Sequence, residues 1–512
     1  MSMMVLRKHV NILNGFNKVK QQTEDTSEGN MKHLKLGKIQ WIALLVVSAM
    51  FVNLCSHMVL AAARDGNDPA QGTTAEATTA SEVTTETTTE QQEETQSMGE
   101  YKAFWFSFYD YDSYRAKYKK RTAANFRTYF TGVVKKGKSL GMNRVIVQVR
   151  PFGDAIYKSK YFPWSKYISG KQGRNPGFDP LKIMVEVAHD NDMKIEAWVN
   201  PYRVTTGSTN YKKLAKNNQA RKWHAKKSTR RNVLSYGGSL YYNPSKKAVR
   251  TLITNGVKEI VQNYDVDGIH MDDYFYPSFT KRNVKKAFDA KEYKKSSYKK
   301  KKKSIYTYRR AQVNTLVIQM KKAVKSVDPN VTYGISPAGN IDNLTSKYSY
   351  YVDIYKWLNS TEYVDYICPQ VYWGFKHPTA KFNKVTDRWI KAAKSKKVKL
   401  YIGIAVYRAG HNVGQNRAER KEWKSDTKVL KKQVQYARKN HVDGFAFFDY
   451  QDLKSKTSAE AVNQLKTVLK QTGNKYCRDH CIEICDGLFL VTADFFSCKL
   501  HYIRNLQRVD II

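Results

Sequence analysis

Short apolar segments recur along the middle of the chain, and each is followed by a longer stretch with helical spacing. Near-continuous apolar character over such short lengths is typical of strands that are covered on both faces of a parallel sheet. The eight segments are 101–110, 144–151, 194–203, 266–274, 331–339, 364–373, 399–408 and 442–450. Amphipathic stretches, which predict helices, lie between them, and the clearest are 126–141, 180–192, 246–264, 309–327 and 426–440.

Strand followed by helix, eight times in succession, predicts an α/β fold of the (β/α)8 TIM-barrel type. A doubly wound open sheet is the alternative, but the glycine-rich phosphate-binding loop typical of that fold does not follow the first segment. In TIM barrels the loops after the strands form the active-site face. The residues that end each apolar segment are therefore the candidates for chemistry.

The fourth segment ends in the most distinctive motif, DGIHMDDYFYP at 267–277. Strand alternation puts His270 and Asp272 on the same face, and Asp273 follows directly, before an aromatic loop. Acidic residues at a strand end often only cap the next helix or face water. Two carboxylates beside a histidine and three aromatic residues favour a reactive site instead.

Polar and aromatic side chains also end most of the other segments. A single tryptophan or tyrosine at such a place is usually core packing, but its recurrence at six or seven strand ends favours a shared binding surface. We predict that hydrogen bonds and ring stacking hold a substrate there. The predicted substrate-binding residues are Arg150, Trp198, Asn200, Tyr202, His270, Tyr274, Asn340, Gln370, Tyr372 and Trp373.

The composition adds a strong preference for anionic partners. The 512 residues contain 88 Lys and Arg against 45 Asp and Glu, which gives a formal net charge of +43. Such a charge attracts polyanions, so nucleic acid, anionic lipid headgroups and acidic cell-wall polymers all qualify. The 35 tyrosines and an aromatic content of 13% add flat surfaces on which sugars or bases can stack.

Residues 1–63 are predicted to form a basic N-terminus followed by a signal peptide or membrane anchor. The apolar stretch 39–63 follows Lys35 and Lys38. Its strongest apolar run is shorter than the ~20 residues of a spanning helix, which suits a secretory signal with a cleavage site at Ala61–Ala63. The basic flank predicts a cytoplasmic N-terminus and an extracellular or cell-surface body, either secreted or anchored in a type II orientation.

Two further segments flank the predicted barrel at 100–473. Residues 64–99 are rich in Thr, Glu, Gln, Ala and Ser and predict a disordered linker. The tail at 474–512 contains four of the six cysteines, but their spacing matches no standard zinc pattern, and it is assigned no role. Because the other two are Cys55 and Cys368, the barrel has no disulfide framework, and we expect neither a metal nor a cofactor.

Several longer motifs in the barrel region resemble a known family. They are NRVIVQVRPFGDAIYKSKYFPWSKYISGKQGRNPGFDPL (143–181), AWVNPYRV (197–204), DGIHMDDYFYP (267–277), YGISPAGN (333–340), DYICPQVYW (365–373) and LYIGIAVY (400–407). The chain resembles the secreted glycosyl-hydrolase-like family 10 over roughly residues 100–470. The resemblance implies a TIM-barrel glycosidase of bacterial cell surfaces. Some members of that family are associated with cutting peptidoglycan glycan strands stripped of their peptides.

Glycosidic cleavage uses one protonated carboxyl group to protonate the leaving oxygen and a second, ionised one to attack or to activate water. We predict Asp272 as the nucleophile or stabilising carboxylate. Asp273, Asp154 and Asp449 are candidates for the proton donor, and the sequence does not rank them. The place at which chitinase-type barrels carry a catalytic glutamate is Tyr274 here, which counts against substrate-assisted catalysis through that group.

Three classes of function are therefore considered. The first is a polysaccharide hydrolase, the second a non-catalytic glycan-binding barrel, and the third a metal-dependent polysaccharide hydrolase or deacetylase with His270, Asp272 and Asp273 as ligands. Expected partners are a polysaccharide, an anionic cell-wall polymer held by the basic surface, and a membrane if 39–63 is retained. The Lys-rich stretch 281–304 reads most simply as a solvated loop. The predicted export signal disfavours a nucleic-acid enzyme, so no nucleic acid is expected.

Overall fold

The computed structural model of this protein describes residues 99–272, 274–395 and 397–471. The predicted signal or anchor segment, most of the linker and the cysteine-containing tail lie outside the described residues, and so does Asp273. Within the described part of the chain, no helix combines the length and the apolar character needed to cross a bilayer.

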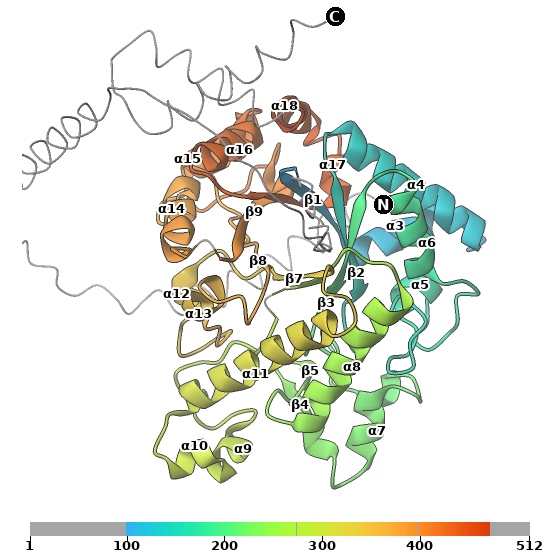
Figure 1. Ribbon diagram of the computed structural model, residues 1–512, viewed down its shortest axis with the longest axis vertical. Coiled ribbons are helices and arrows are strands. Elements are labelled where there is room, and N and C mark those ends of the chain that lie inside the picture. Colours follow the sequence, from blue (N-terminus) through green and yellow to red (C-terminus); the bar gives the residue numbers. More distant parts are fainter. Residues whose placement is uncertain (1–98, 273, 396, 472–512) are drawn as a thin grey trace, which may run out of the picture. The chain divides into compact units, whose positions relative to one another are not determined.

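Eight parallel strands close into a barrel, which confirms the predicted TIM-barrel fold (Figure 1). Each strand lies inside one of the eight apolar segments, and the last strand pairs with the first to complete the circle. In barrel order the strands are β1 (Tyr101–Phe106), β2 (Arg144–Arg150), β3 (Lys194–Val199), β6 (Gly268–Met271), β7 (Thr332–Ile335), β8 (Tyr366–Ile367), β9 (Lys399–Ala405) and β10 (Gly444–Phe448).

The helices surround the strands (Figure 1). The five clearest predicted helices are all present, as α4 (Ala123–Ser139), α6 (Pro180–His189), α8 (Lys247–Asn263), α11 (Ile305–Lys325) and α16 (Val429–Lys439). The other helices are α3 (Phe108–Lys117), α5 (Lys166–Ser169), α7 (Gln219–Ala225), α9 (Ala290–Lys295), α10 (Ser297–Lys300), α12 (Ile341–Leu344), α13 (Ile354–Leu358), α14 (Phe382–Ala392), α15 (Arg417–Ser425), α17 (Tyr450–Leu453) and α18 (Ala459–Leu469). Single 3-10 turns are η1 (Tyr211–Lys213), η2 (Arg230–Asn232) and η3 (Val406–Arg408).

A small antiparallel hairpin in the connection between β3 and α8 was not predicted. It consists of β4 (Val233–Tyr236) and β5 (Ser239–Tyr242), joined by Gly237 and Gly238. Both glycines have positive φ angles, 51° and 74°, as a two-residue hairpin turn requires. The two adjacent glycines between short apolar runs were the available signal for this hairpin.

The inside of the barrel is packed with side chains. Strand residues alternate between the barrel interior and the surrounding helices, so Phe104 and Val147 belong to the large core beneath the helices. The smaller interior cluster comprises Tyr101, Ala103, Trp105, Ile146, Trp198, Tyr366, Cys368 and Ala446. Because the interior is filled, a substrate-binding site is expected at the strand ends, as in other barrels of this type.

Gly334 of β7 makes room for a large interior ring. A Cβ atom at this position would lie 2.0 Å from Cζ of Tyr366. We expect Gly334→Ala to lower the free energy of unfolding by about 1–3 kcal/mol, as for other overpacked cores, measured by urea denaturation. Gly132→Ala is the matched control, because the position lies in α4 and a Cβ there meets nothing within 4 Å. Equal stability of the two variants would contradict this account of Gly334.

Candidate active site

Asp272 lies at the C-terminal end of β6, in the mouth of the barrel, and its side chain is held in place by two donors. The indole Nε1 of Trp198 donates a hydrogen bond to Asp272 Oδ2 at 3.2 Å, and the backbone N–H of Tyr274 donates to Oδ1 at 3.4 Å. Asp272 is only 2% exposed. Its carboxylate is thus fixed at the strand end rather than directed into bulk water.

Burial sets the acidity of this carboxyl group. It raises the pKa of Asp272 from its ordinary value to about 6, while the nearby Arg203 guanidinium and the hydrogen bonds from Tyr274 and Trp198 act in the opposite direction. A carboxyl group with a pKa near the working pH can exchange a proton or act ionised, as acid–base catalysis requires.

Strand register explains why Trp198 reaches Asp272. Trp198 of β3 is the direct partner of His270 in β6, and Asp272 lies two residues beyond His270 on the same inward face. The rings of Trp198 and His270 pack edge to face, with centroids 6.2 Å apart. The motif at 267–277 and the tryptophan at the end of the preceding barrel strand therefore meet as the alternation of the two strands predicts.

His270 is fully buried beneath this carboxylate, and both of its ring nitrogens have partners. Trp105 Nε1 lies 3.2 Å from His270 Nε2, and the hydroxyl of Tyr366 lies 2.7 Å from Nδ1. Burial lowers the pKa of His270 to about 3, so the ring is neutral. An indole N–H can only donate, so Nε2 accepts and the ring proton must be on Nδ1.

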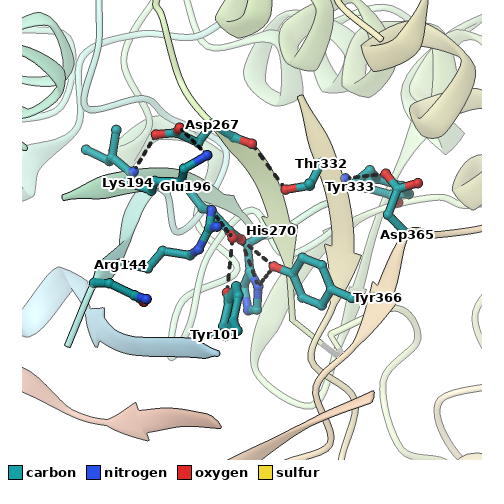
Figure 2. A network of polar contacts seen from close by, with 12 residues as sticks. Tyr101, Arg144, Lys194, Glu196, Asp267, His270, Thr332, Tyr333, Asp365 and Tyr366 are labelled. Carbon is teal, nitrogen blue, oxygen red and sulfur yellow. Dashed lines mark hydrogen bonds and ion pairs between the residues drawn. The ribbon is translucent and has the colours of Figure 1, made fainter. Parts of the chain in front are cut away.

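These assignments give the interior a single direction of hydrogen bonding. His270 Nδ1–H donates to the Tyr366 oxygen, and the Tyr366 hydroxyl in turn donates to the carboxylate of Glu196 (Figure 2). Glu196 also accepts a hydrogen bond from Tyr101 at 3.0 Å and pairs with Arg144 at 3.2 Å. A directed chain therefore runs from Trp105 through His270 and Tyr366 to the Glu196–Arg144 pair.

Glu196 was missed by the sequence analysis. It is 0% exposed and lies in the middle of β3. Burial raises its pKa, against the opposing influence of Arg144 and the two tyrosine hydroxyls. An acidic residue within an otherwise apolar strand was the available signal, because a charge in that place needs a partner.

Aromatic rings continue from His270 across the barrel to the mouth. Trp105 contacts His270 and Phe448, with ring centroids 5.8 Å and 5.9 Å away. Phe448 is stacked with Tyr372 at 5.9 Å and meets Tyr407 at 6.2 Å. Trp105 and Phe448 were not among the predicted binding residues, because each lies within an apolar segment where a large ring is expected to be part of the core. Trp105 is buried, whereas Phe448, Tyr372 and Tyr407 are partly exposed and have apolar faces on which a sugar ring could stack.

The structure also brings Tyr274 to the mouth, where it is 36% exposed. The guanidinium carbon of Arg203 lies 3.9 Å from the centre of its ring, and Arg203 in turn influences Asp272. Asn200 belongs to the same region, since its side-chain oxygen accepts from the backbone N–H of Arg203 at 3.3 Å. Tyr274, Asn200, Trp198 and Asp272 thus come from two adjacent strand ends.

The contacts of the other predicted binding residues are mainly structural. Arg150 is 1% exposed, its guanidinium lies 4.6 Å from the centre of the Phe162 ring, and its Nη2 donates a hydrogen bond to the backbone oxygen of Asn200 at 3.4 Å. The hydroxyl of Tyr202 is buried. Asn340 caps the N-terminus of α12, and Gln370 donates to the backbone oxygen of Ser336.

Trp373 lies further along the loop after β8, with its ring 6.0 Å from that of His377. It is partly buried, and its backbone oxygen accepts a hydrogen bond from Gln433 at 2.9 Å. Of the predicted rings on this loop, Tyr372 is therefore the one that joins the aromatic run through Phe448. The roles proposed for all of these residues remain predictions.

Two of the three candidate proton donors lie within the described residues. Burial raises the pKa of Asp154 to about 6, and Gln172 donates to its Oδ2 at 2.8 Å. Asp449 caps α17 by accepting from the backbone N–H of Gln451. Burial and neighbouring Asp449, to which it is hydrogen bonded, raise the pKa of Asp452 to about 8. Asp452 was not predicted, and it gives Asp449 a protonated neighbour.

The metal-dependent alternative needs a free histidine nitrogen. Both nitrogens of His270 are engaged by Trp105 and Tyr366, so this side chain is not available as a ligand in the observed arrangement. In the described ranges, no group of three or more His, Cys, Asp or Glu side chains is arranged to hold a metal ion. Asp273, the remaining proposed ligand, lies outside those ranges.

Comparison with known proteins gives matches over the barrel. The sequence profile of the family described as Glycosyl hydrolase-like 10 matches residues 104–424. Glycosyl hydrolase YngK of Bacillus subtilis is 36% identical over 298 residues, which are 54% of this chain and 54% of that protein. Glycosyl hydrolase DigH of Escherichia coli K12 is 34% identical over 285 residues, 53% of this chain and 64% of that protein. The chain thus spans between about half and two thirds of the length of these curated relatives.

Solved structures with a similar fold include the PgaB (BpsB) glycoside hydrolase domain from Bordetella bronchiseptica. It has a TM-score of 0.45 and 12% sequence identity, and the match covers 72% of this chain and 98% of that one.

Proposed function

Because this chain belongs to the glycosyl hydrolase-like 10 family, we propose that it hydrolyses glycosidic bonds of a polysaccharide, with Asp272 as the nucleophile or stabilising carboxylate. The observation that carries this proposal is the state of Asp272. It is buried in the barrel mouth, held by Trp198 and Tyr274, and its pKa is raised to about 6 by burial. A carboxylate with these properties, beside a run of aromatic rings, suits sugar-bond cleavage.

The substrate that we propose is the glycan strand of peptidoglycan without its stem peptides. The motif resemblance supports this choice, and the predicted export signal would place the barrel outside the cytoplasm, where such strands occur. Trp198 and Tyr372 would stack on sugar rings, and Tyr274 and Asn200 would contact hydroxyl groups at the rim. Asp154, Asp449 and Asp273 remain the candidate proton donors.

The substrate is tested by incubating the purified full-length chain with peptide-free glycan strands, intact peptidoglycan and a neutral polysaccharide. We expect new reducing ends mainly from the peptide-free strands, and product masses would identify the bond that is cut. Release from the neutral polysaccharide alone would contradict the proposed substrate but not the glycosidase activity. Binding without any release would favour the non-catalytic glycan-binding barrel.

The pH dependence of kcat/KM tests the hydrogen bond between Trp198 and Asp272. If Asp272 works ionised, kcat/KM falls as the pH drops below about 6, because the raised pKa leaves the group protonated there. The Trp198 hydrogen bond stabilises the ionised form, so Trp198→Phe raises the pKa of Asp272 further. We expect the acid limb of the profile, where kcat/KM falls, to move to a pH about one unit higher, equivalent to ~1.4 kcal/mol.

Trp373→Phe is the control for this measurement, because its ring contacts His377 rather than Asp272. Trp373→Phe is expected to change KM without changing the pH at which the acid limb falls. A shift of the alkaline limb instead, with the acid limb unchanged, would assign Asp272 the role of proton donor. A profile unchanged in Trp198→Phe would refute the coupling between these two residues.

A further inference from the structure

Two long connections on the active-site side of the barrel are unusually cationic. Residues 200–246, which link β3 to α8, contain 11 Lys and Arg and no Asp or Glu. Residues 274–304, which link β6 to α11, contain 12 Lys and Arg and only two acidic residues. Both connections leave the C-terminal ends of their strands, so they rise from the same end of the barrel as Asp272.

The two connections are tied together into one structure. Arg231 binds Glu292 with both guanidinium arms at 2.6 Å, and Lys246 reaches the same carboxylate at 3.4 Å. The side chain of Asn283 donates to the hydroxyl of Tyr236 in the hairpin at 2.8 Å. In Figure 1, α7, β4 and β5 of the first connection lie in the same lower region as α9 and α10 of the second. These contacts make the second connection an ordered part of the barrel, not only a solvated loop.

The acidic residues of these connections are turned inward and neutralised. Asp289 is 0% exposed and accepts from Arg309 Nε and the Tyr276 hydroxyl, both at 2.8 Å. Glu292 is paired with Arg231 and Lys246. Every exposed cation of the two connections is without an ion-pairing carboxylate in the described part of the chain. These cations are Lys212, Lys213, Lys216, Lys222, Lys226, Lys227, Arg230, Lys281, Arg282, Lys285, Lys286, Lys291, Lys294, Lys295, Lys299, Lys300, Lys301, Lys302 and Lys303.

We propose that these exposed cations, here called the cationic shoulder, bind a linear polyanion next to the barrel mouth. This inference rests on the proposed function in that the polyanion would hold the enzyme beside the glycan it cuts. The partner is an anionic polymer with closely spaced phosphate or carboxylate groups, recognised through its charge. Lysine predominates, and a lysine ammonium acts as a point charge that does not distinguish the two kinds of group.

The aromatic side chains of the second connection already have ring partners. The rings of Tyr293 and Tyr298 are partly buried and pack on Tyr308, with centroids 5.6 Å and 5.7 Å away, which counts against their serving as exposed platforms for the stacking of bases. Among the described residues, the exposed large apolar side chains are Tyr274, Tyr348 and Tyr355, and Tyr274 alone belongs to these connections. The shoulder therefore has no row of apolar groups to insert into a bilayer.

The shoulder is tested by binding of inorganic polyphosphate to the full-length chain carrying Asp272→Asn, so that no turnover is involved. The shoulder variant combines Lys294→Gln, Lys295→Gln, Lys299→Gln and Lys300→Gln. The control variant combines Lys421→Gln, Lys424→Gln, Lys428→Gln and Lys439→Gln, which remove the same charge from α15, α16 and the turn between them. All eight lysines are exposed.

We expect the shoulder variant to bind polyphosphate at least about tenfold more weakly at 0.1 M salt, whereas the control variant changes little. The slope of log affinity against log salt should become shallower by about 3, since each lost contact on a single strand contributes roughly 0.7. Polygalacturonate should show the same pattern if carboxylates serve equally. Oligothymidylate of equal charge should bind no more tightly than polyphosphate.

Equal weakening in both variants would overturn the proposal, because net charge alone would then explain binding. Tighter binding of oligothymidylate would point to a nucleic-acid partner instead. Loss of binding to anionic-lipid vesicles in the shoulder variant, with polyphosphate binding intact, would point to a membrane. None of these outcomes depends on glycosidase activity, which is measured separately in the Asp272-intact chain on short peptide-free glycan fragments and is expected to be unchanged by the lysine substitutions.

Discussion

Asp272→Asn is expected to lower kcat on the proposed glycan substrate by about 10²–10⁴-fold, the usual contribution of a positioned acid–base group. Asparagine has nearly the same shape, and its oxygen can still accept the Trp198 hydrogen bond that holds Asp272 Oδ2 at 3.2 Å. It cannot ionise, so it can neither attack the sugar carbon nor stabilise positive charge there. The measurement is the rate of reducing-end release by the purified full-length chain.

Asp154→Asn, Asp273→Asn and Asp449→Asn, which cover the three candidate proton donors, are the comparison variants for this experiment. The proton donor among them should show a similar loss on natural glycans and a smaller loss on substrates with a good leaving group, which need little protonation. If the role of Asp449 is limited to capping α17, its substitution should change stability more than the dependence of the rate on the leaving group. Full turnover in Asp272→Asn would remove Asp272 from the mechanism.

Glu196→Ala is expected to destabilise the protein by about 3–5 kcal/mol, because removal of one partner leaves a buried charge without compensation. Arg144 is only 8% exposed and pairs with Glu196 at 3.2 Å. Two tyrosine hydroxyls, those of Tyr101 and Tyr366, would also lose their acceptor. Urea denaturation followed by tryptophan fluorescence measures the change.

Glu186→Ala is the matched control for a lost ion pair. Glu186 pairs with Arg127 on the protein surface, where both side chains are well exposed, and such pairs contribute about 0–1 kcal/mol. The double variant Glu196→Leu with Arg144→Met, which removes both buried charges, should recover much of the lost stability. A cost for Glu196→Ala no greater than that for Glu186→Ala would show that the interior pair does not stabilise the barrel.

The strand pattern was readable in the sequence because it follows from burial alone. All eight apolar segments contain a barrel strand, and the five clearest amphipathic stretches are helices. The inward position of Asp272 also followed from strand alternation, since Trp198 and His270 are register partners. These features depend on local periodicity, which a single sequence records.

The side-chain direction of Arg150 does not follow from the alternation of residues along a strand. Simple alternation would place it on the same face as Gln148, but the register between β2 and β3 shifts between Gln148 and Arg150. A bulge of this kind adds one residue to one strand and turns the following side chain to the other face. Arg150 consequently pairs with Val199 in register and packs on Phe162.

The partners of His270 could not be read from the sequence for a different reason. Its contacts, Trp105 and Tyr366, are 165 and 96 residues away in the chain. Only barrel closure brings β1, β6 and β8 around a common axis. The same holds for Glu196 and Arg144, whose pairing depends on the alignment of β2 with β3.

The fixed polarity of the hydrogen bonds from Trp105 to Glu196 has a consequence for proton supply. Reversing that chain would require the Trp105 indole nitrogen to accept a hydrogen bond, which it cannot do. Protons therefore cannot hop along the barrel axis through these groups. In the proposed hydrolysis, these groups therefore provide no proton route between the mouth and the far end of the barrel, and the catalytic carboxyl groups would exchange their protons on the mouth side.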